Sequence, residues 1–324
     1  MRGFESKRVV AACTLVVVVA AAWVVVANEP WEEDSAPPQE ANAAPPRTVA
    51  MPGSTAPVRG ATREASKYAL DPRPSPLPVK VEFDKPPSAG VLFNVESGEI
   101  LWQKGPTREL PIASLTKMMT GLLVAERHRP GERVEITPEA LAYEGSGVGV
   151  LPKGERVRLE AMLNGLLLVS GNDAAIALAQ HDAGSVGDFV RRMNKRAREL
   201  GLTCTRFSSP HGLQDEGNHS CALDLAALAR ADLANPRVRR IVGDDHERFA
   251  FPIKGGFLDL YNNNPFLQRG VPGITGVKTG YTDAAGRCYV ITQRSGGRQL
   301  GVVLLHSPHP LPQVTELLRA GFRS

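Results

Sequence analysis

The stretch "LPIASLTKMMTGLLVAE", residues 110–126, places a serine and a lysine inside what its pattern predicts to be a buried helix. Leu115, Met118 and Leu122 recur at helical spacing. Ser114 and Lys117 are three positions apart, so a helix would bring hydroxyl and ammonium onto one face. A desolvated lysine tends to lose its proton, and a neutral lysine can activate a neighbouring serine. The alternative is a serine at a helix start and a lysine that extends to solvent, so the rest of the chain must decide.

Composition limits the other possibilities. The chain has 324 residues and a formal net charge of +4, which allows one large domain or two small ones. The basic cluster "RVRR" at 237–240 follows "NP" and is interpreted as the solvated start of a short helix. This charge density predicts no nucleic-acid partner.

The N-terminal region predicts export. Residues 1–8 carry basic side chains and are expected to stay in the cytoplasm, and residues 9–27 form an uncharged, mostly apolar run. That run is long enough to span a bilayer once, so we predict a transmembrane anchor, or a signal peptide whose cleavage would release the protein. Residues 28–80 are rich in Pro and Ala and predict a disordered linker. A globular domain is expected at 81–324, and a chain that begins near residue 80 is expected to fold.

The globular part predicts an α/β fold. Strand patterns occur at 89–104, 273–281 and 286–306. Helical patterns lie between or after them, at 159–169, 171–183, 185–200, 221–234 and 311–322. Strands at both ends of the domain predict an antiparallel sheet built from distant segments and flanked by helices, with a mainly helical region as its other wall.

Two further motifs follow the first. "LLLVSGNDAA" contains Ser170 and Asn172, and "GITGVKTGYT" contains Lys278, Thr279 and Gly280. Each motif alone could be a helix cap or a strand edge. Together and in this order they match the S-x-x-K, S-x-N and K-T-G motifs of penicillin-binding proteins and class A β-lactamases.

With these motifs the chain resembles the D-alanyl-D-alanine carboxypeptidases among the low-molecular-mass penicillin-binding proteins. The resemblance extends over about residues 80–324 and includes "SSPHGL" (208–213), "YNNNPFL" (261–267) and "GVKTGYTDAAGRC" (276–288). It implies a penicillin-binding-protein/β-lactamase-like domain. It also implies that the enzyme removes the terminal D-alanine of peptidoglycan stem peptides through an acyl-enzyme, that β-lactams inhibit it, and that no metal or organic cofactor takes part.

The resemblance also implies a role for each motif residue. Ser114 would be the nucleophile and Lys117 its neutral general base. Ser170 would relay a proton to the leaving amine, and Asn172 would hold Lys117 and the substrate amide.

Lys278 and Thr279 would bind the terminal carboxylate of the substrate, and Gly280 would let the substrate backbone approach the strand. The backbone N–H groups of Ser114 and Tyr281 would form the oxyanion hole.

Three alternatives stay open. The same residues could serve a D,D-endopeptidase that cleaves peptidoglycan cross-links. A class A-like β-lactamase would need a glutamate for deacylation, but the candidate in "EAMLN", Glu160, precedes Ser170 and lies in the helix leading into it. A non-catalytic peptidoglycan-binding protein should have lost a motif residue, and none is lost.

His211 and His219 lack the spacing of a zinc peptidase, and His211 is expected to be structural.

The cysteines give one further prediction. Cys13 lies in the apolar run, and Cys204 and Cys221 bracket a loop that a disulfide would close in an exported protein. Cys288 lies on a predicted core strand and is expected to act as a small buried hydrophobe.

Overall fold

The structure, a computed structural model, describes residues 67–70, 76–213 and 216–324. The chain divides into two units, Met1–Ala56 and Pro57–Ser324, and every described residue belongs to the second. The segments expected at 1–8 and 9–27, and most of the linker expected at 28–80, lie outside the described residues. Among the residues that are described, no helix is long and apolar enough to cross a membrane.

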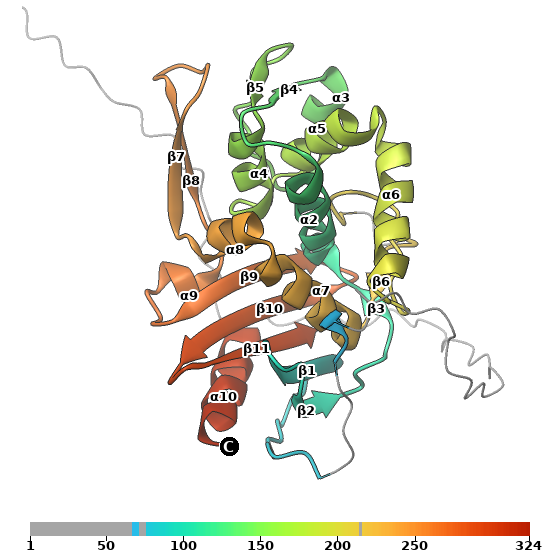
Figure 1. Cartoon of the computed structure of the whole chain (residues 1–324), viewed down its shortest axis with the longest axis vertical. Helices are drawn as coiled ribbons and strands as arrows, with labels where there is room; N and C mark the ends of the chain where they lie inside the picture. Colours follow the sequence, from blue (N-terminus) through green and yellow to red (C-terminus); the bar gives the residue numbers. More distant parts are fainter. Residues whose placement is uncertain (1–66, 71–75, 214–215) are drawn as a thin grey trace, which may run out of the picture. The chain divides into compact units, whose positions relative to one another are not determined.

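A five-stranded antiparallel sheet forms the lower half of the view in Figure 1, with strand order β2-β1-β11-β10-β9. Val91 of β1 pairs with Val303 of β11, and Val290 of β10 pairs with Lys278 of β9. The predicted sheet built from distant segments is therefore confirmed. Its strands are β1 (Ala89–Asn94), β2 (Ile100–Lys104), β9 (Ile274–Thr282), β10 (Gly286–Ser295) and β11 (Arg298–Leu305).

Both faces of the sheet are covered, which explains why β1 and β11 are almost wholly apolar. Leu92 and Val302 belong to a cluster with Leu317 of helix α10 (Pro310–Arg323). Val91 and Val303, which alternate with them, belong to the larger cluster that continues into the helical region. Successive side chains of a strand point to opposite faces of the sheet, so neighbouring residues of β1 and β11 pack into two different cores.

The helical region occupies the middle of the chain. Its helices at 159–167, 172–183, 186–199 and 222–234 lie within two residues of the predicted ranges, whereas those at 138–141 and 265–268 were not predicted. Local capping explains several boundaries. Ser185 accepts a hydrogen bond from the Asp188 N–H at the start of α6, and Asn235 caps α8, with Pro236 in its first turn. The helices are α2 (Lys117–Arg127), α3 (Pro138–Leu141), α4 (Leu159–Leu167), α5 (Asn172–Ala183), α6 (Val186–Glu199), α7 (Ala222–Ala234), α8 (Pro236–Gly243) and α9 (Pro265–Gln268).

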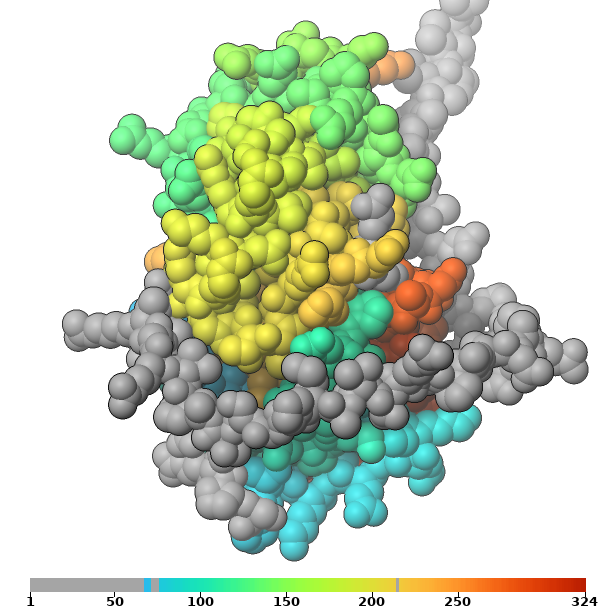
Figure 2. All heavy atoms as spheres, turned by 90° about the vertical axis from the view of Figure 1, so that its right-hand side faces the viewer, coloured from blue at the N-terminus to red at the C-terminus, as the bar shows by residue number. Residues whose placement is uncertain are grey.

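Burial differs sharply among these helices. In α2 every residue from Lys117 to Val124 is buried, whereas α6 buries only Phe189, Met193 and Ala197. The yellow segment around α6 accordingly forms a broad outer surface of the helical region in Figure 2. Helix α2 is therefore the central helix, and its first residue is the lysine of the first motif.

Three small antiparallel pairs complete the fold, and the sequence analysis predicted none of them. The longest is a hairpin of β7 (His246–Ala250) and β8 (Phe257–Tyr261), which projects beside the helical region in Figure 1. The other two pairs are β3 (Leu110–Pro111) with β6 (His219–Ser220), and β4 (Arg133–Glu135) with β5 (Arg156–Arg158).

The packed part of the chain begins upstream of the boundary expected at residue 81. Val79 is 5% exposed, and the Trp102 indole donates to the Val81 carbonyl at 3.0 Å. The Arg230 guanidinium donates to the carbonyl oxygens of Tyr68 and Ala69, both at 2.7 Å. Residues 67–70 and 76–80 therefore contribute contacts that the linker interpretation did not include.

Candidate active site

Ser114 lies on a single 3-10 turn, η1 (Ala113–Thr116), which leads directly into α2. The preceding Ala113 has φ 48°, a left-handed value that costs free energy outside glycine and is frequent at functional sites. Ile112 and Leu115 are fully buried on either side and fix this turn in the core. The serine hydroxyl is thereby held at the start of the central helix.

Lys117 is the partner of this hydroxyl. Its ammonium nitrogen Nζ lies 2.9 Å from Ser114 Oγ and 2.9 Å from the carbonyl oxygen of His211. The side chain is fully buried, and burial lowers the pKa of Lys117 well below its ordinary value. The positive charge of Lys278 lowers this pKa further, while Asp173 opposes the shift. The geometry and the pKa direction both favour a neutral amine that can accept a proton from Ser114.

The loop that supplies the His211 carbonyl is anchored closely to η1 and α2. Gly212 has φ +80°, and a Cβ atom there would lie 2.0 Å from the Ala113 carbonyl oxygen. Thr120 donates to the Pro210 carbonyl at 2.7 Å. His211 itself is half-buried, and partial burial together with the nearby Lys117 lowers its pKa to about 4, so its ring is neutral near pH 7. The sequence analysis expected a structural role for His211 but missed its carbonyl as the second acceptor of Lys117.

The second motif provides two unsatisfied polar atoms. Ser170 is 3% exposed, has φ 63°, and its Oγ has no hydrogen-bond partner among the described residues. Asn172 donates through Nδ2 to the Glu144 carbonyl at 2.6 Å, but its Oδ1 has no partner within the described part of the chain. Buried polar atoms without partners are rare and call for an explanation. A bound substrate would supply the missing partners.

Asp173, the next residue, holds the neighbouring loop. Its carboxylate accepts hydrogen bonds from the N–H groups of Val148 and Gly149 at 2.9 and 3.0 Å. The Asn172 N–H donates to the Ser146 carbonyl at 2.8 Å in the same loop. The first turn of α5 thus fixes the loop beside the site, a role that the sequence analysis did not assign to Asp173.

The third motif lies on β9, an edge strand of the sheet. Lys278 is 2% exposed, burial lowers its pKa to about 7, and its Nζ donates to the Thr279 carbonyl at 2.8 Å. The Thr279 hydroxyl donates to Oδ1 of Asn263 at 3.3 Å. A Cβ atom on Gly280 would lie 2.9 Å from the backbone nitrogen of Ser114, so β9 and η1 are in direct contact at this residue. Hence Ser114, Lys117 and the third motif lie together.

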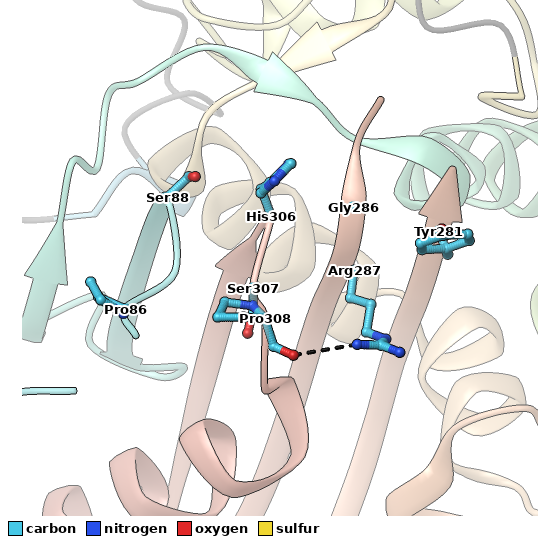
Figure 3. A pocket seen from close by; sticks show the side chains of 8 residues that line it. All are labelled: Pro86, Ser88, Tyr281, Gly286, Arg287, His306, Ser307 and Pro308. Atoms are coloured by element: carbon cyan, nitrogen blue, oxygen red, sulfur yellow. Dashed lines mark hydrogen bonds between the residues drawn. The ribbon is translucent and has the colours of Figure 1, made fainter. Parts of the chain in front are cut away.

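Tyr281 continues the same strand into a neighbouring pocket. Its side chain is half exposed, and its hydroxyl donates to Asp283 at 3.0 Å. The pocket has a volume of about 350 Å³, and Tyr281, Arg287 and His306 are among its lining residues (Figure 3). Because Tyr281 follows Gly280, this pocket adjoins the candidate site.

Glu160 is placed outside this site. Its carboxylate pairs with the guanidinium groups of Arg237 at 2.6 Å and Arg240 at 2.5 Å. The Arg237 side chain is only 14% exposed, so interpreting "RVRR" as solvated was wrong for this residue. The pairing of α8 with α4 explains Glu160 without a catalytic role.

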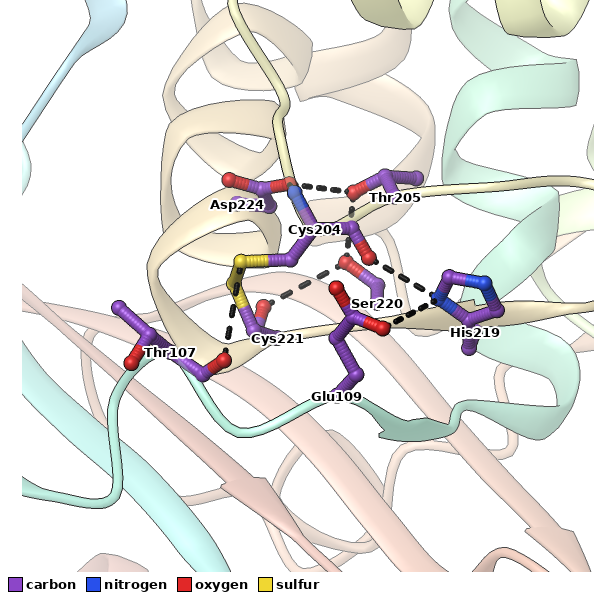
Figure 4. Close-up of a disulfide and its surroundings, with 8 residues drawn as sticks. All are labelled: Thr107, Glu109, Cys204, Thr205, His219, Ser220, Cys221 and Asp224. Atoms are coloured by element: carbon purple, nitrogen blue, oxygen red, sulfur yellow. Dashed lines mark hydrogen bonds and ion pairs between the residues drawn. A yellow bond between two sulfur atoms is a disulfide. The ribbon is translucent and has the colours of Figure 1, made fainter. Parts of the chain in front are cut away.

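The structure contains a disulfide between Cys204 and Cys221, whose Cα atoms are 5.6 Å apart (Figure 4). Asp224 supports the same loop by accepting hydrogen bonds from the Cys204 N–H and the Thr205 hydroxyl, both at 2.7 Å. Cys288 is a buried thiol on β10 whose Sγ lies 3.4 Å from the Ala285 carbonyl oxygen. The described residues therefore place the three cysteines as the sequence analysis expected.

Among curated proteins, the chain is similar to known peptidases. The chain is 34% identical over 242 residues to the D-alanyl-D-alanine carboxypeptidase DacF of Bacillus subtilis, which covers 72% of this chain and 61% of that protein. It is 34% identical over 225 residues to DacB2 of Mycobacterium tuberculosis, which covers 69% of this chain and 76% of that protein. The chain also spans 64% of DacD of Salmonella typhimurium, so it corresponds to only part of several relatives.

Solved structures share the fold. A D-alanyl-D-alanine carboxypeptidase from Mycobacterium tuberculosis matches with a TM-score of 0.71 at 30% identity, covering 76% of this chain and 94% of that one. The Streptomyces K15 DD-transpeptidase matches with a TM-score of 0.70 at 28% identity, covering 76% of this chain and 100% of that one. The predicted penicillin-binding-protein-like fold is confirmed. The family model described as D-alanyl-D-alanine carboxypeptidase matches residues 84–309, and the chain belongs to this peptidase family.

Proposed function

We propose that the protein is a serine-type D-Ala-D-Ala carboxypeptidase that removes the terminal D-alanine of peptidoglycan stem peptides. The observation that carries this proposal is the fully buried Lys117, whose Nζ lies 2.9 Å from Ser114 Oγ and whose pKa is lowered by burial. A neutral amine at hydrogen-bond distance from a hydroxyl is the arrangement that general-base activation requires.

Acylation follows from this pair. Ser114 Oγ attacks the carbonyl carbon of the terminal peptide bond, and its proton passes to Lys117 Nζ. The backbone N–H groups of Ser114 and Tyr281 are proposed to stabilise the negative oxygen, and one such donor is typically worth about 3 kcal/mol of the barrier. The C–N bond then breaks, and the leaving amine receives a proton through Ser170. The unpartnered Oγ of Ser170 supports this relay.

Deacylation reverses the proton transfers. A water molecule attacks the ester carbonyl and gives its proton to Lys117, and the Ser114–carbonyl bond breaks. The serine recovers a proton, and the shortened peptide leaves as a carboxylic acid. Glu160 takes no part because its carboxylate is paired with two arginines on α8.

Substrate recognition is assigned to the edge of β9 and the start of α5. A protonated Lys278 would bind the terminal carboxylate of the substrate, with a second hydrogen bond from the Thr279 hydroxyl. The unpartnered Oδ1 of Asn172 would accept from the substrate amide. Gly280, which has no side chain, would let the substrate backbone approach the edge of β9.

Penicillin tests the proposal because it presents a carbonyl and a carboxylate as a D-Ala-D-Ala terminus does. Intact mass measurement should show one lasting adduct on the wild-type protein and none on Ser114→Ala. A peptide ending in D-Ala-D-Ala should lose one D-alanine. Rapid drug turnover without an adduct would indicate a β-lactamase instead, and an adduct without peptide cleavage would favour the non-catalytic alternative.

D,D-endopeptidase activity is a second candidate, favoured by the pocket that adjoins Tyr281. A volume of about 350 Å³ beside Tyr281 offers space for a leaving group larger than D-alanine. Cross-linked muropeptide dimers should be cleaved if this candidate holds. Comparing kcat/KM for the dimer with that for the linear peptide would distinguish the two activities.

An extracytoplasmic location and an N-terminal tether are also proposed. The location is supported by the family and by the disulfide, because disulfides persist outside the cytoplasm. The apolar run at 9–27 would anchor the protein in the membrane, unless it is cleaved as a signal. Fractionation of cells, together with the N-terminal sequence of the mature protein, would test both points.

A further inference from the structure

A second cluster of chemistry-bearing side chains lies at the opposite ends of the two helices that carry the motif residues. His128 follows the last residue of α2, Glu132 lies in the loop after it, and His181 belongs to the last turn of α5. Nδ1 of His128 is 2.8 Å and Nε2 of His181 is 3.0 Å from the same oxygen, Oε2 of Glu132. The three ligand atoms all lie within 4.8 Å of one another. Two imidazole nitrogens and one carboxylate oxygen therefore converge.

Two of the three side chains, those of His128 and Glu132, also form a hydrogen bond through their other polar atom. The other ring nitrogen of His128, Nε2, lies 2.8 Å from Oδ1 of Asp182, whose side chain is completely buried. The other oxygen of Glu132, Oε1, accepts the Arg129 N–H at 2.7 Å. A carboxylate behind a ligating histidine fixes its ring orientation, and this is the usual outer shell of a metal site in proteins.

The neighbouring arginines pair with Asp182 and not with the converging atoms of His128, Glu132 and His181. Arg127 and Arg192 are the nearby cations, and both are bound to the Asp182 carboxylate, at 2.7 and 2.6 Å. Among the described residues, Glu132 forms no ion pair with an arginine or lysine, and its side-chain partners are the two histidines. The side chains of His128, His181 and Glu132 are 15%, 22% and 35% exposed, so a small ion can reach them from solvent.

We propose that His128, Glu132 and His181 form a binding site for a divalent transition-metal ion, with zinc as the best fit. Zinc takes imidazole and carboxylate ligands, often with three protein ligands and a water. Tetrahedral ligands at zinc bond lengths stand about 3.3 Å apart. The two N–O separations, 2.8 and 3.0 Å, need to widen slightly, and the two imidazole nitrogens, which lie within 4.8 Å of each other, need to reach the same spacing.

This ion would be remote from the candidate active site. Helix α2 begins at Lys117 and ends at Arg127. A helix of its 11 residues is about 16 Å long. The metal would join the end of α2 to the end of α5 and stabilise the helical region. It would have no place in the chemistry of Ser114, so the proposal stands independently of the proposed function.

The test uses the untagged full chain in detergent, treated with EDTA and then dialysed. Zinc chloride, titrated against a chromophoric chelator, should bind at one ion per chain and raise the melting temperature. Co²⁺ should give the visible absorption bands of a four-coordinate ion with nitrogen ligands. His181→Gln removes a ligand and should abolish both effects, while His246→Gln is the matched control and should keep them.

Two further variants make the test decisive. Glu132→Gln is nearly isosteric and covers the case in which His181→Gln fails to fold. Asp182→Asn should weaken zinc binding by about 10- to 100-fold, the usual effect of losing an outer-shell partner. The proposal is overturned if the wild-type chain binds no zinc at one equivalent, or if Glu132→Gln and His181→Gln bind it as tightly as the wild type. In either case the cluster is only an ion-pair network between two helix ends.

Discussion

Gly280 of β9 touches the backbone of Ser114 so closely that a Cβ atom on the glycine would lie 2.9 Å from the serine nitrogen. The same Cβ atom would lie 3.3 Å from the Ile112 carbonyl oxygen. Both neighbours are backbone atoms, so they cannot rotate away as the end of a side chain would. The separation between the third motif and the nucleophile is therefore set by the absence of a side chain at Gly280.

Gly280→Ala should force β9 and η1 apart and slow acylation by penicillin by about 100-fold, because small displacements of reacting groups are costly. Gly187→Ala on α6 is the control, since the nearest atom to its new methyl group is the end of Arg191 at 3.9 Å. Stopped-flow or mass-based acylation rates would measure both. If Gly280→Ala were acylated at the wild-type rate, that result would contradict the close contact between Gly280 and Ser114.

The pH dependence of kcat/KM should be bell-shaped, because Lys117 must be neutral and Lys278 must be charged. The lowered pKa of Lys117 sets the acid side, where activity falls as the amine becomes protonated. Lys278 has a pKa of about 7 in the free protein, so its ammonium, and with it carboxylate recognition, is lost as the pH rises through that value.

Lys278→Arg should extend activity to higher pH, since a guanidinium stays charged throughout this range. Initial rates with a D-Ala-D-Ala peptide between pH 5 and 10 would show whether the alkaline side moves. An unchanged alkaline side would assign that ionisation to another group.

Glu160→Gln should lower stability without changing the lifetime of the penicillin adduct. The substitution removes the charge that pairs with Arg237 and the partly exposed Arg240, a loss of about 1 to 3 kcal/mol in the free energy of unfolding. Urea denaturation and the decay of the adduct mass would measure the two quantities. Longer adduct lifetime in Glu160→Gln than in the wild type would show that the glutamate activates water.

Replacing both Cys204 and Cys221 by serine should reduce the free energy of unfolding by roughly 3 kcal/mol in the chain-entropy model. Acylation by penicillin should persist below the new melting temperature, because the disulfide contacts none of the motif residues. Cys288→Ser provides a comparison for a cysteine outside the disulfide. Thiol labelling of denatured, non-reduced protein should modify neither Cys204 nor Cys221, and modification of both would disprove the bridge.

A chain that begins at residue 67 should be more stable than one that begins at residue 81. The shorter chain loses the carbonyl acceptors of Arg230 at Tyr68 and Ala69, and the buried Val79. Hydrogen bonds to a charged group contribute about 1.5 to 3 kcal/mol each, so a difference of several kcal/mol is expected. Equal melting temperatures for the two chains would support a domain boundary at residue 81, as composition predicted.

Periodicity was sufficient to predict the central sheet and the larger helices, and the three motifs were matched by their residues and order, because all of these patterns are local. The acceptors around Lys117 were not predictable in this way. The His211 oxygen belongs to the backbone, which has no letter in the sequence, and it lies 94 positions from the lysine. Glu160 and Arg237 are 77 positions apart. The charges within α8 alone therefore predicted that the Arg237 side chain would be exposed to solvent. The β7–β8 hairpin was missed because few of its residues are buried to mark a core-facing strand.

The reactivity of Ser114 depends on segments that are distant in sequence. The pKa of Lys117 is lowered by its burial in the folded core, and the charge of Lys278, more than 160 positions later, lowers it further. In an unfolded chain the same lysine is an ordinary, protonated surface amine, and the serine beside it is as inert as any other. On the proposed mechanism, a nascent or misfolded chain would attack no amide, and labelling by penicillin would report the fraction of chains that have reached the native state.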